Sequence, residues 1–137
     1  MAYDDQNIFA RILRGELPAF KVYEDEHVLA FMDVMPQAEG HTLVIPKTPA
    51  LTLLDLDPEA AAYTIQIVQK VAKAMEKALD VQGIVLMQLS GAAAGQTVPH
   101  VHFHLIPTSV HELGKHAAKL GDMEKIQAIS EKIKAAL

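Results

Sequence analysis

The most regular hydrophobic pattern in the chain is a strict alternation over residues 100–105. The histidines are His100, His102 and His104, and the positions between them hold Val101, Phe103 and Leu105. A period of two predicts a half-buried strand, with the three imidazoles on one face and the apolar side chains on the other. Prolines at 99 and 107 flank the run, as is usual at the ends of strands.

The remaining patterns predict a mixture of helices and strands. Helical spacing predicts helices over residues 4–14, 58–79, 110–120 and 122–137. Apolar or alternating runs predict strands over 17–24, 27–34, 42–46 and 84–89. The first two strands are separated by a polar turn and should form a hairpin, whereas 42–46 is apolar on both faces and should be central. Asp57 and Pro58 suit the N-cap and the first position of the long helix.

Three imidazoles on one strand face leave several interpretations open. An exposed His-rich strand, or core histidines each bonded to a carbonyl, would explain them without chemistry. A metal site is disfavoured, because the outer two positions lie about 13 Å apart along a strand and no cysteine supplies further ligands. Nucleophilic catalysis fits better, since a neutral imidazole is a competent nucleophile near its ordinary pKa of about 6.5.

The stretch that leads into the alternating run consists of small residues. Residues 90–95 read Ser-Gly-Ala-Ala-Ala-Gly. Small side chains allow backbone N–H groups to approach an anion closely. A phosphate-binding loop is therefore expected directly before the histidines.

Composition narrows the class of protein. A chain of 137 residues is expected to form one domain, and its formal net charge of −5 disfavours a nucleic-acid binder. The chain has no cysteine, so disulfides and thiolate metal sites are excluded. We see neither a signal peptide nor an apolar run of about 20 residues, and therefore expect a cytoplasmic protein without a membrane partner.

The motifs resemble those of a known family. Gly95-Gln96-Thr97-Val98 followed by the His-φ-His-φ-His run is similar to the signature of the histidine triad (HIT) superfamily of nucleotidyl hydrolases and transferases, most of all its Hint-like bacterial branch. Four upstream segments also match the family in order and spacing: Ile8-Phe9 with Ile12, and residues 22–26, 30–34 and 41–47.

The resemblance, which covers residues 8–107, implies an α+β HIT-like fold. We expect an antiparallel sheet of about five strands with the long helix packed on it, a short N-terminal helix, a HIT domain over 1–108 and a C-terminal helical extension over 109–137. The apolar arc of the long helix is wider than one sheet face requires. A deeply buried helix would explain it, but the resemblance favours a homodimer interface.

The resemblance also implies catalytic roles. His102 would attack the α-phosphorus of a nucleotide and form a nucleotidyl-histidine. His104 would donate to a non-bridging phosphate oxygen, the Thr97 hydroxyl would share the developing charge, and His100 would orient His102.

Substrate contacts are implied for residues elsewhere in the chain. Ile8 and Phe9 would form one wall of a nucleobase pocket, and Phe31 would lie in that pocket or in the core. Asp33 would bind ribose hydroxyls. His41 would lie behind the triad, amides near Gly95 would bind phosphate, and Gln96 would orient the phosphate or the attacking water.

The sequence departs from the family pattern in two places. Leu89 occupies the position of an Asn that usually contacts phosphate, which removes a donor. The residues Asn7, Ala10 and Pro49 occupy positions that hold zinc ligands in many relatives. We therefore predict no structural zinc and no cofactor.

The expected function is that of a HIT-family nucleotidyl hydrolase. The substrate would be a purine nucleoside phosphoramidate or a dinucleoside polyphosphate. A dimeric nucleotide-binding or interaction protein with little catalysis is the alternative that Leu89 keeps open, and a His-x-His metal enzyme is disfavoured. His111 and His116 are expected at the surface.

Overall fold

The fold is taken from a computed structural model that describes residues 2–113 and 120–137. A five-stranded antiparallel sheet lies at its centre, in the order β1-β2-β3-β5-β4. The strands are β1 (Lys21–Glu24), β2 (Val28–Met32), β3 (Thr42–Pro46), β4 (Val85–Gln88) and β5 (Phe103–Ile106). The expected α+β class, the hairpin and the central position of β3 are thereby confirmed.

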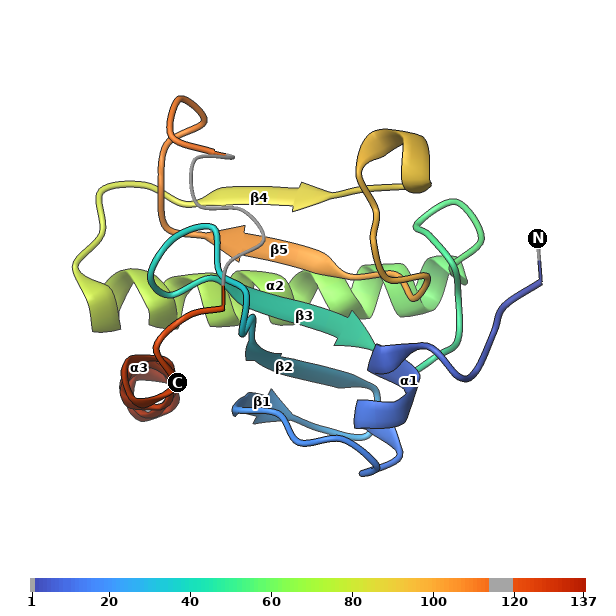
Figure 1. The fold of residues 1–137 in the computed structure, drawn as a ribbon, viewed down its shortest axis with the longest axis horizontal. Coiled ribbons are helices and arrows are strands. Elements are labelled where there is room, and N and C mark those ends of the chain that lie inside the picture. The colour runs from blue at the N-terminus through green and yellow to red at the C-terminus, as the bar shows by residue number, and fades with distance from the viewer. Residues whose placement is uncertain (1, 114–119) are drawn as a thin grey trace.

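Helices cover the sheet from two sides. The long helix α2 (Pro58–Leu79) runs across one face, while the short α1 (Ile8–Leu13) sits over the other, near one end of β2 and β3 (Figure 1). The helix α3 (Met123–Ala136) packs beside β1 and against α2. A 3₁₀ turn, η1 (Ala92–Ala94), follows β4.

The two sheet faces build two apolar clusters. Val44 and Phe103 belong to the larger one, between the sheet and the helices α2 and α3. Leu43 and Ile45 belong to the smaller one, beneath α1, together with Phe9, Ile12, Leu29 and Phe31. This is the period of two expected of a pleated sheet, and it places the histidine face of β5 on the side of α1.

Most of the apolar arc of α2 is used within the chain itself. Ile67, Val68, Val71, Ala74 and Met75 are buried in the larger cluster. Ile65, at 44% exposure, lies outside it. The Asp57 side chain accepts from the N–H of Ala60 and Pro58 opens the helix, as the sequence predicted.

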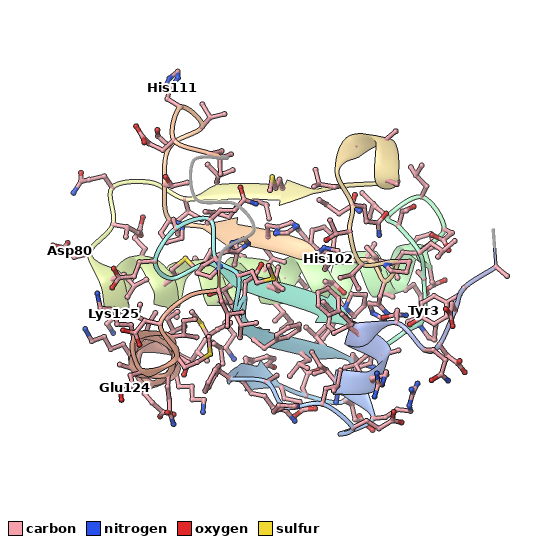
Figure 2. All side chains as sticks on the ribbon, in the orientation of Figure 1. Tyr3, Asp80, His102, His111, Glu124 and Lys125 are labelled. Carbon is pink, nitrogen blue, oxygen red and sulfur yellow. The ribbon has the colours of Figure 1, made fainter. Side chains whose placement is uncertain are left out.

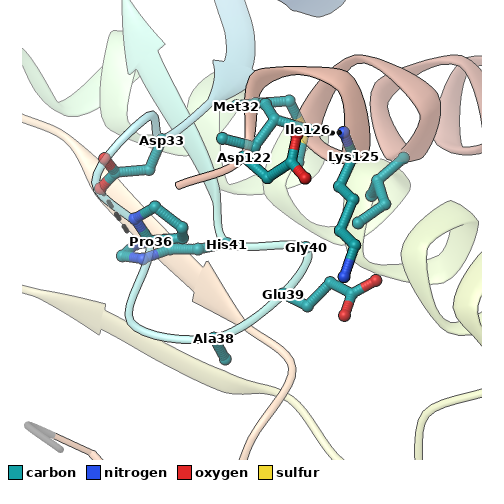
Figure 3. Close-up of a pocket in the computed structure, with 11 residues that line it drawn as sticks. Met32, Asp33, Pro36, Ala38, Glu39, Gly40, His41, Asp122, Lys125 and Ile126 are labelled. Atoms are coloured by element: carbon teal, nitrogen blue, oxygen red, sulfur yellow. Dashed lines mark hydrogen bonds and ion pairs between the residues drawn. The ribbon is translucent and has the colours of Figure 1, made fainter. Parts of the chain in front are cut away.

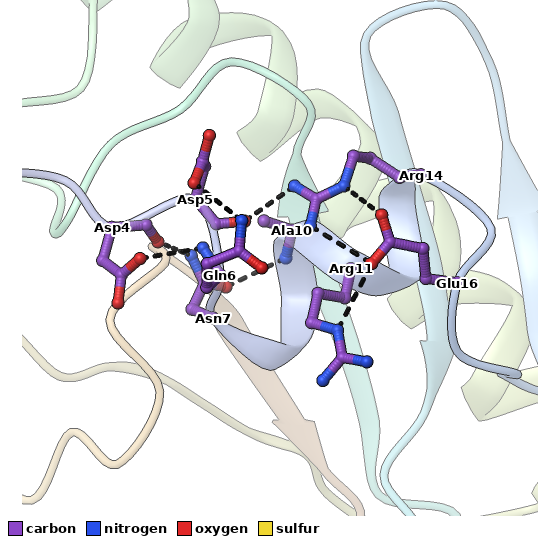
Figure 4. A network of polar contacts seen from close by, with 8 residues as sticks. All are labelled: Asp4, Asp5, Gln6, Asn7, Ala10, Arg11, Arg14 and Glu16. Atoms are coloured by element: carbon purple, nitrogen blue, oxygen red, sulfur yellow. Dashed lines mark hydrogen bonds and ion pairs between the residues drawn. The ribbon is translucent and has the colours of Figure 1, made fainter.

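Several boundaries differ from the prediction for identifiable reasons. The first helix begins at Ile8 rather than residue 4, because Asn7 caps it: Asn7 Oδ1 accepts from the N–H of Ala10 at 2.9 Å. Figure 4 shows this cap and the Arg14 guanidinium, which reaches the carbonyl of Asp5 and the Glu16 carboxylate. Gly15, with φ +79°, ends the helix, as expected of glycine after a last turn.

The strand predicted from residue 100 begins only at Phe103. Before it the backbone leaves the sheet, since the N–H of Val101 donates to Ala50 O. The alternation nevertheless keeps Val101 buried in the larger cluster. At the C-terminus α3 confirms the last predicted helix, whereas residues 110–113 form a turn, so the helix predicted over 110–120 is wrong there. His111 is exposed, and His116 lies outside the described residues.

Across the described residues, no helix combines the length and the apolar character needed to cross a membrane.

Candidate active site

The histidine face of the sheet opens into a cavity of about 540 Å³. One end is apolar and lies between α1 and β2, with Ile8, Phe9 and Phe31 in its walls. The other end carries polar groups, among them Asp33, Thr97 and His102 from the loops and His104 from β5. The site residues expected from the sequence thus largely converge on one cavity. Phe31 belongs both to the hydrophobic core and to the lining of the cavity. It is buried, lines the cavity and packs edge-on against Phe9.

His102 is held in one tautomer by the backbone. Its Nδ1 lies 2.6 Å from the carbonyl oxygen of His100. A carbonyl only accepts, so Nδ1 carries the hydrogen and Nε2 keeps its lone pair. The ring is wedged edge-on against Phe9, with centroids 4.9 Å apart. Burial lowers the pKa of His102 and outweighs the opposing effect of the carbonyl, so the imidazole is neutral at pH 7.

His104 is set in the opposite tautomer by a chain of two hydrogen bonds. The Gln37 N–H donates to Nδ1 of His41 at 3.0 Å. Nδ1 of His41 is therefore unprotonated and its Nε2 carries the hydrogen, which points to Nδ1 of His104 at 2.9 Å. Nε2 of His104 must then carry a hydrogen of its own.

His41 and His104 are both neutral near pH 7. Burial, followed by the nearby His102, lowers the pKa of His104 to about 4. Burial, with His104 and His102, lowers the pKa of His41 to about 3. No fully buried side-chain nitrogen or oxygen of the described residues lacks a partner. The Nε2 atoms of His102 and His104, for which no partner is found there, are therefore open to the cavity, one as an acceptor and the other as a donor.

Asp33 stands beside this chain. Its Oδ1 accepts from the N–H of Met35 at 2.8 Å, and its Oδ2 lies 3.5 Å from Nε2 of His41. Burial raises the pKa of Asp33 against the opposing effect of the Met35 amide. Asp33, His41 and His104 place ligand atoms within 4.8 Å of one another, as a metal site would. A metal would need the lone pair of His41 Nε2, however, and the Gln37 amide forces a hydrogen onto that atom. The cluster is therefore better suited to hydrogen bonding than to metal binding.

His100 lies deeper than the other two triad histidines and bonds at both ring nitrogens. Nε2 donates to Pro46 O at 2.8 Å, so Nδ1 is the acceptor and receives the Tyr3 hydroxyl at 2.6 Å. Burial lowers the pKa of His100 more than the Pro46 carbonyl raises it. The backbone carbonyl of His100, rather than its ring, bonds His102. Figure 2 shows Tyr3 on the N-terminal arm, and no periodicity in the sequence pointed to it.

The small-residue loop is folded on itself. Gly91 and Gly95 have φ of +99° and +107°, which favours glycine. The Gln96 side chain stabilises the loop. Its Oε1 accepts from the Gly91 N–H, and its Nε2 donates to Leu51 O and Val98 O. The Gly95 N–H donates to Ala92 O. Gly95 and Thr97 line the cavity, whereas the Gln96 amide is occupied by three backbone groups.

Comparison with known proteins shows the family to which the chain belongs. The sequence matches the model of the HIT domain family over residues 14–111. This chain belongs to the HIT family. A crystal structure of a Hit-like protein involved in cell-cycle regulation from Bartonella henselae is 49% identical, covers all of both chains and superposes with a TM-score of 0.92. Adenosine 5'-monophosphoramidase HNT1 of Saccharomyces cerevisiae is 43% identical over 73% of this chain and 61% of that protein.

A third HIT relative, from Mycobacterium smegmatis, was solved as a zinc-bound protein. It is 34% identical, covers 96% of this chain and 92% of its own, and has a TM-score of 0.82. In the present chain, the four positions that hold zinc ligands in the family pattern, residues 7, 10, 49 and 100, offer zinc no free ligand atom. Asn7 is used as the helix cap, Ala10 and Pro49 have no ligand atom in their side chains, and both nitrogens of His100 are taken.

Near Gly95 and Thr97, the polar end of the cavity is apolar at one point. Leu89 lines the cavity, and its Cδ1 lies 3.5 Å from the place where a Cβ on Gly95 would sit. Gln88 does not replace the missing donor, because its amide bonds Leu89 O and the Ser90 hydroxyl.

Sequence reasoning missed several residues of this HIT cavity. Pro18, Ala19 and Val98 contribute apolar walls, and Val34, Met35 and Gln37 come from the loop after β2. Loop residues give no periodic signal. Only the closeness of the 34–37 segment to Asp33 in the sequence could have suggested it.

Proposed function

We propose that the protein hydrolyses purine nucleoside 5'-phosphoramidates at the α-phosphorus, through a nucleotidyl intermediate on Nε2 of His102. The observation that carries the proposal is the pair of opposed tautomers. One buried imidazole offers a lone pair to the cavity, and its neighbour, with ring centroids 4.9 Å away, offers an N–H. A nucleophile and an oxyanion donor are the two groups that attack at phosphorus requires.

The rest of the cavity suits a nucleotide. The apolar end is lined by Ile8, Phe9 and Phe31, whose apolar and aromatic side chains would suit a purine base. Asp33, at the boundary between the apolar and polar ends, would accept from ribose hydroxyls. The Thr97 hydroxyl would donate to the phosphate. The Gly95 and Gln96 amides do not have the phosphate role expected from the sequence, because their N–H groups donate to Ala92 O and Gly91 O.

The reaction would proceed in two steps. Nε2 of His102 forms a bond to phosphorus as the P–N bond breaks and the leaving nitrogen takes up a proton from solvent to depart as an amine. The His104 N–H stabilises the charge on a non-bridging oxygen. The nucleotidyl-imidazole is cationic, since Nδ1 keeps its hydrogen, and the His100 carbonyl accepts from that hydrogen. Water then attacks phosphorus, the P–Nε2 bond breaks, and the nucleoside monophosphate leaves with neutral His102 restored.

A phosphoramidate is favoured over a dinucleoside polyphosphate as the substrate. Among the described residues, neither Lys nor Arg lines the cavity, and the chain carries a net charge of −5. A polyphosphate leaving group brings several negative charges that would lack partners there. The monophosphoramidase name of the yeast relative points in the same direction.

The proposal is tested by incubating the protein with adenosine 5'-phosphoramidate and, separately, with a diadenosine polyphosphate. We expect AMP from the first at a rate far above that from the second. His102→Ala should abolish release, whereas His111→Ala, at an exposed histidine, should leave it unchanged. Equal release by wild type and His102→Ala would overturn the proposal.

The second candidate is a dimeric nucleotide-binding protein with little turnover. It is favoured by one observation, the apolar Leu89 at the phosphate end of the cavity. It predicts that AMP binds while the phosphoramidate is released unchanged. In either case the homodimer remains a prediction of the family resemblance, and the exposed Ile65 on α2 is available to it.

A further inference from the structure

The loop between β2 and β3, residues 33–41, carries much of the polar end of the site. It is closed at its base, where the Asp33 N–H donates to the His41 carbonyl at 2.9 Å. Asp33, Val34, Met35 and Gln37 line the active-site cavity. On its other side the loop borders a second cavity of about 290 Å³, shared with the start of α3 (Figure 3). The loop is therefore held between the active site and the C-terminal extension.

The segment leading into α3 is bonded to this loop. The Gly121 N–H donates to Val34 O at 3.0 Å. Gly121 also packs so closely that a Cβ there would lie 3.0 and 3.1 Å from two ring carbons of Pro36, and 2.8 Å from Cδ1 of Ile126. The Ile126 methyl is the end of a flexible side chain, whereas the proline ring is fixed to the backbone. A side chain at 121 would therefore shift Pro36 by a few tenths of an ångström.

A shift of Pro36 affects the hydrogen bonds that run from Gln37 through His41 to His104. The peptide that joins Pro36 to Gln37 begins at the Pro36 Cα, so a displacement of Pro36 also displaces the Gln37 N–H. That N–H donates to Nδ1 of His41 and so determines which nitrogen of His41, and then of His104, carries a hydrogen.

We infer that the C-terminal extension is a positioning element for catalysis: Gly121 holds Pro36 so that Gln37 fixes the tautomers of His41 and His104. Gly121 touches neither the cavity nor the reacting atoms and acts through the loop. The kinetic part of the inference rests on the proposed function, because it assumes that the His104 N–H stabilises the transition state. The tautomer part does not, and can be measured without a substrate.

The test is Gly121→Ala, followed by ¹⁵N NMR of the imidazoles, whose shifts separate protonated from unprotonated nitrogens. Wild type should show hydrogen on Nε2 of both His41 and His104, and the variant a mixture of tautomers at both. With adenosine 5'-phosphoramidate, kcat should fall about three- to tenfold, part of the 10²–10³ that complete loss of an oxyanion donor costs. KM should change by less than about twofold, since the interaction is made in the transition state.

Two further variants separate positioning from general packing. Gly83→Ala makes the same chemical change at a glycine with open space around it and should alter neither readout. In the double variant Gly121→Ala/Ile126→Val, the new methyl group at 121 no longer meets Cδ1 of residue 126 but still meets the Pro36 ring. The mixed tautomers should therefore persist. Wild-type tautomers in Gly121→Ala, or their recovery in the double variant, would overturn the inference. Absence of turnover in wild type with the expected tautomers would count against the proposed function alone.

Discussion

At the scale of single residues, two backbone groups determine the opposite tautomers of the neighbouring histidines His102 and His104. The His100 carbonyl makes His102 an acceptor towards the cavity, and the Gln37 N–H, through His41, makes His104 a donor. Chemically identical side chains are thereby given opposite roles without any charged partner. Burial keeps the rings of His41, His102 and His104 neutral. A nucleophilic imidazole and a stable hydrogen-bond chain both require neutral rings.

The lowered pKa values predict an unusual acid limb in the activity profile. In the proposed mechanism turnover requires His102 without a proton on Nε2, and burial holds the pKa of His102 below its ordinary 6.5. As the pH falls through 6.5, activity should therefore persist, and it should decline only at more acidic pH. The measurement is kcat/KM against pH with adenosine 5'-phosphoramidate, corrected for its spontaneous hydrolysis. Half-loss of kcat/KM at or above pH 6.5 would contradict this prediction.

Leu89 offers a second test at a single position. Leu89→Asn should place a donor at the polar end of the cavity and raise kcat/KM at least about tenfold, since a hydrogen bond to a charged group is worth about 1.5–3 kcal/mol and about 1.4 kcal/mol corresponds to a factor of ten. Leu89→Ala is the matched control, because it removes the apolar side chain without adding a donor and should not reproduce the gain. An unchanged rate in Leu89→Asn would place this side chain outside phosphate contact.

The triad histidines, the cavity walls at Ile8 and Phe9, and the position of Asp33 followed from short sequence motifs. The hydrogen bond from Tyr3 to His100 did not, since it joins residues 97 positions apart and Tyr3 belongs to no periodic pattern. The position of the Gln96 amide was also beyond prediction, because its three partners are backbone groups whose place depends on the folded loop.

At the scale of elements, strands and the long helix were predictable because burial imposes a period on them. The residues before β5 were not, because Val101 leaves the sheet to bond Ala50, a contact set by the 46–57 connection rather than by local pattern. The first helix was predicted too long for a local reason, the capping geometry of Asn7.

Asp25 joins the hairpin to α2 and supports a prediction about stability. Its Oδ1 accepts from the N–H groups of His27 and Val28, and its Oδ2 from the hydroxyls of Tyr23 and Tyr63. Burial alone would raise the pKa of Asp25, but the tyrosine and backbone donors together lower it from 3.8 to about 2. The stabilisation is therefore complete above pH 3.8 and is lost as the pH falls towards 2.

Asp25→Asn should lower the free energy of unfolding at pH 7 by about 1.5 kcal/mol, the lower end for bonds to a charged group because the site is partly exposed. The difference from wild type should shrink below pH 4. Urea denaturation at several pH values measures both. Glu26→Gln, at an exposed acid of the same turn, should be close to neutral; an equal loss in that variant would show that net charge, not the network, is responsible.

At the scale of the whole molecule, α3 shares the core of the sheet. Ile126, Ile129 and Ile133 are buried in the cluster that also holds β-strand and α2 side chains. Its predicted helical form is confirmed, but its place against β1 and α2 was not visible in the sequence, because nothing local says which face an amphipathic helix covers.

Ile133→Ala should therefore cost about 3 kcal/mol of unfolding free energy, as expected for a fully buried isoleucine. Leu137→Ala, in the same helical segment but 39% exposed, should change it by less than about 0.5 kcal/mol. Chemical denaturation of both variants makes the comparison. Similar small effects at the two positions would mean that α3 is not part of the cooperative unit.

The central claim, a bond between phosphorus and Nε2 of His102, is tested most directly by trapping the intermediate. Wild-type protein mixed with excess adenosine 5'-phosphoramidate and quenched in alkaline denaturant within one turnover should carry one adenylyl group, located on His102 by peptide mass spectrometry. His102→Ala should carry none. AMP release from wild type with no adduct at any time point, or with the adenylyl group on another residue, would contradict it.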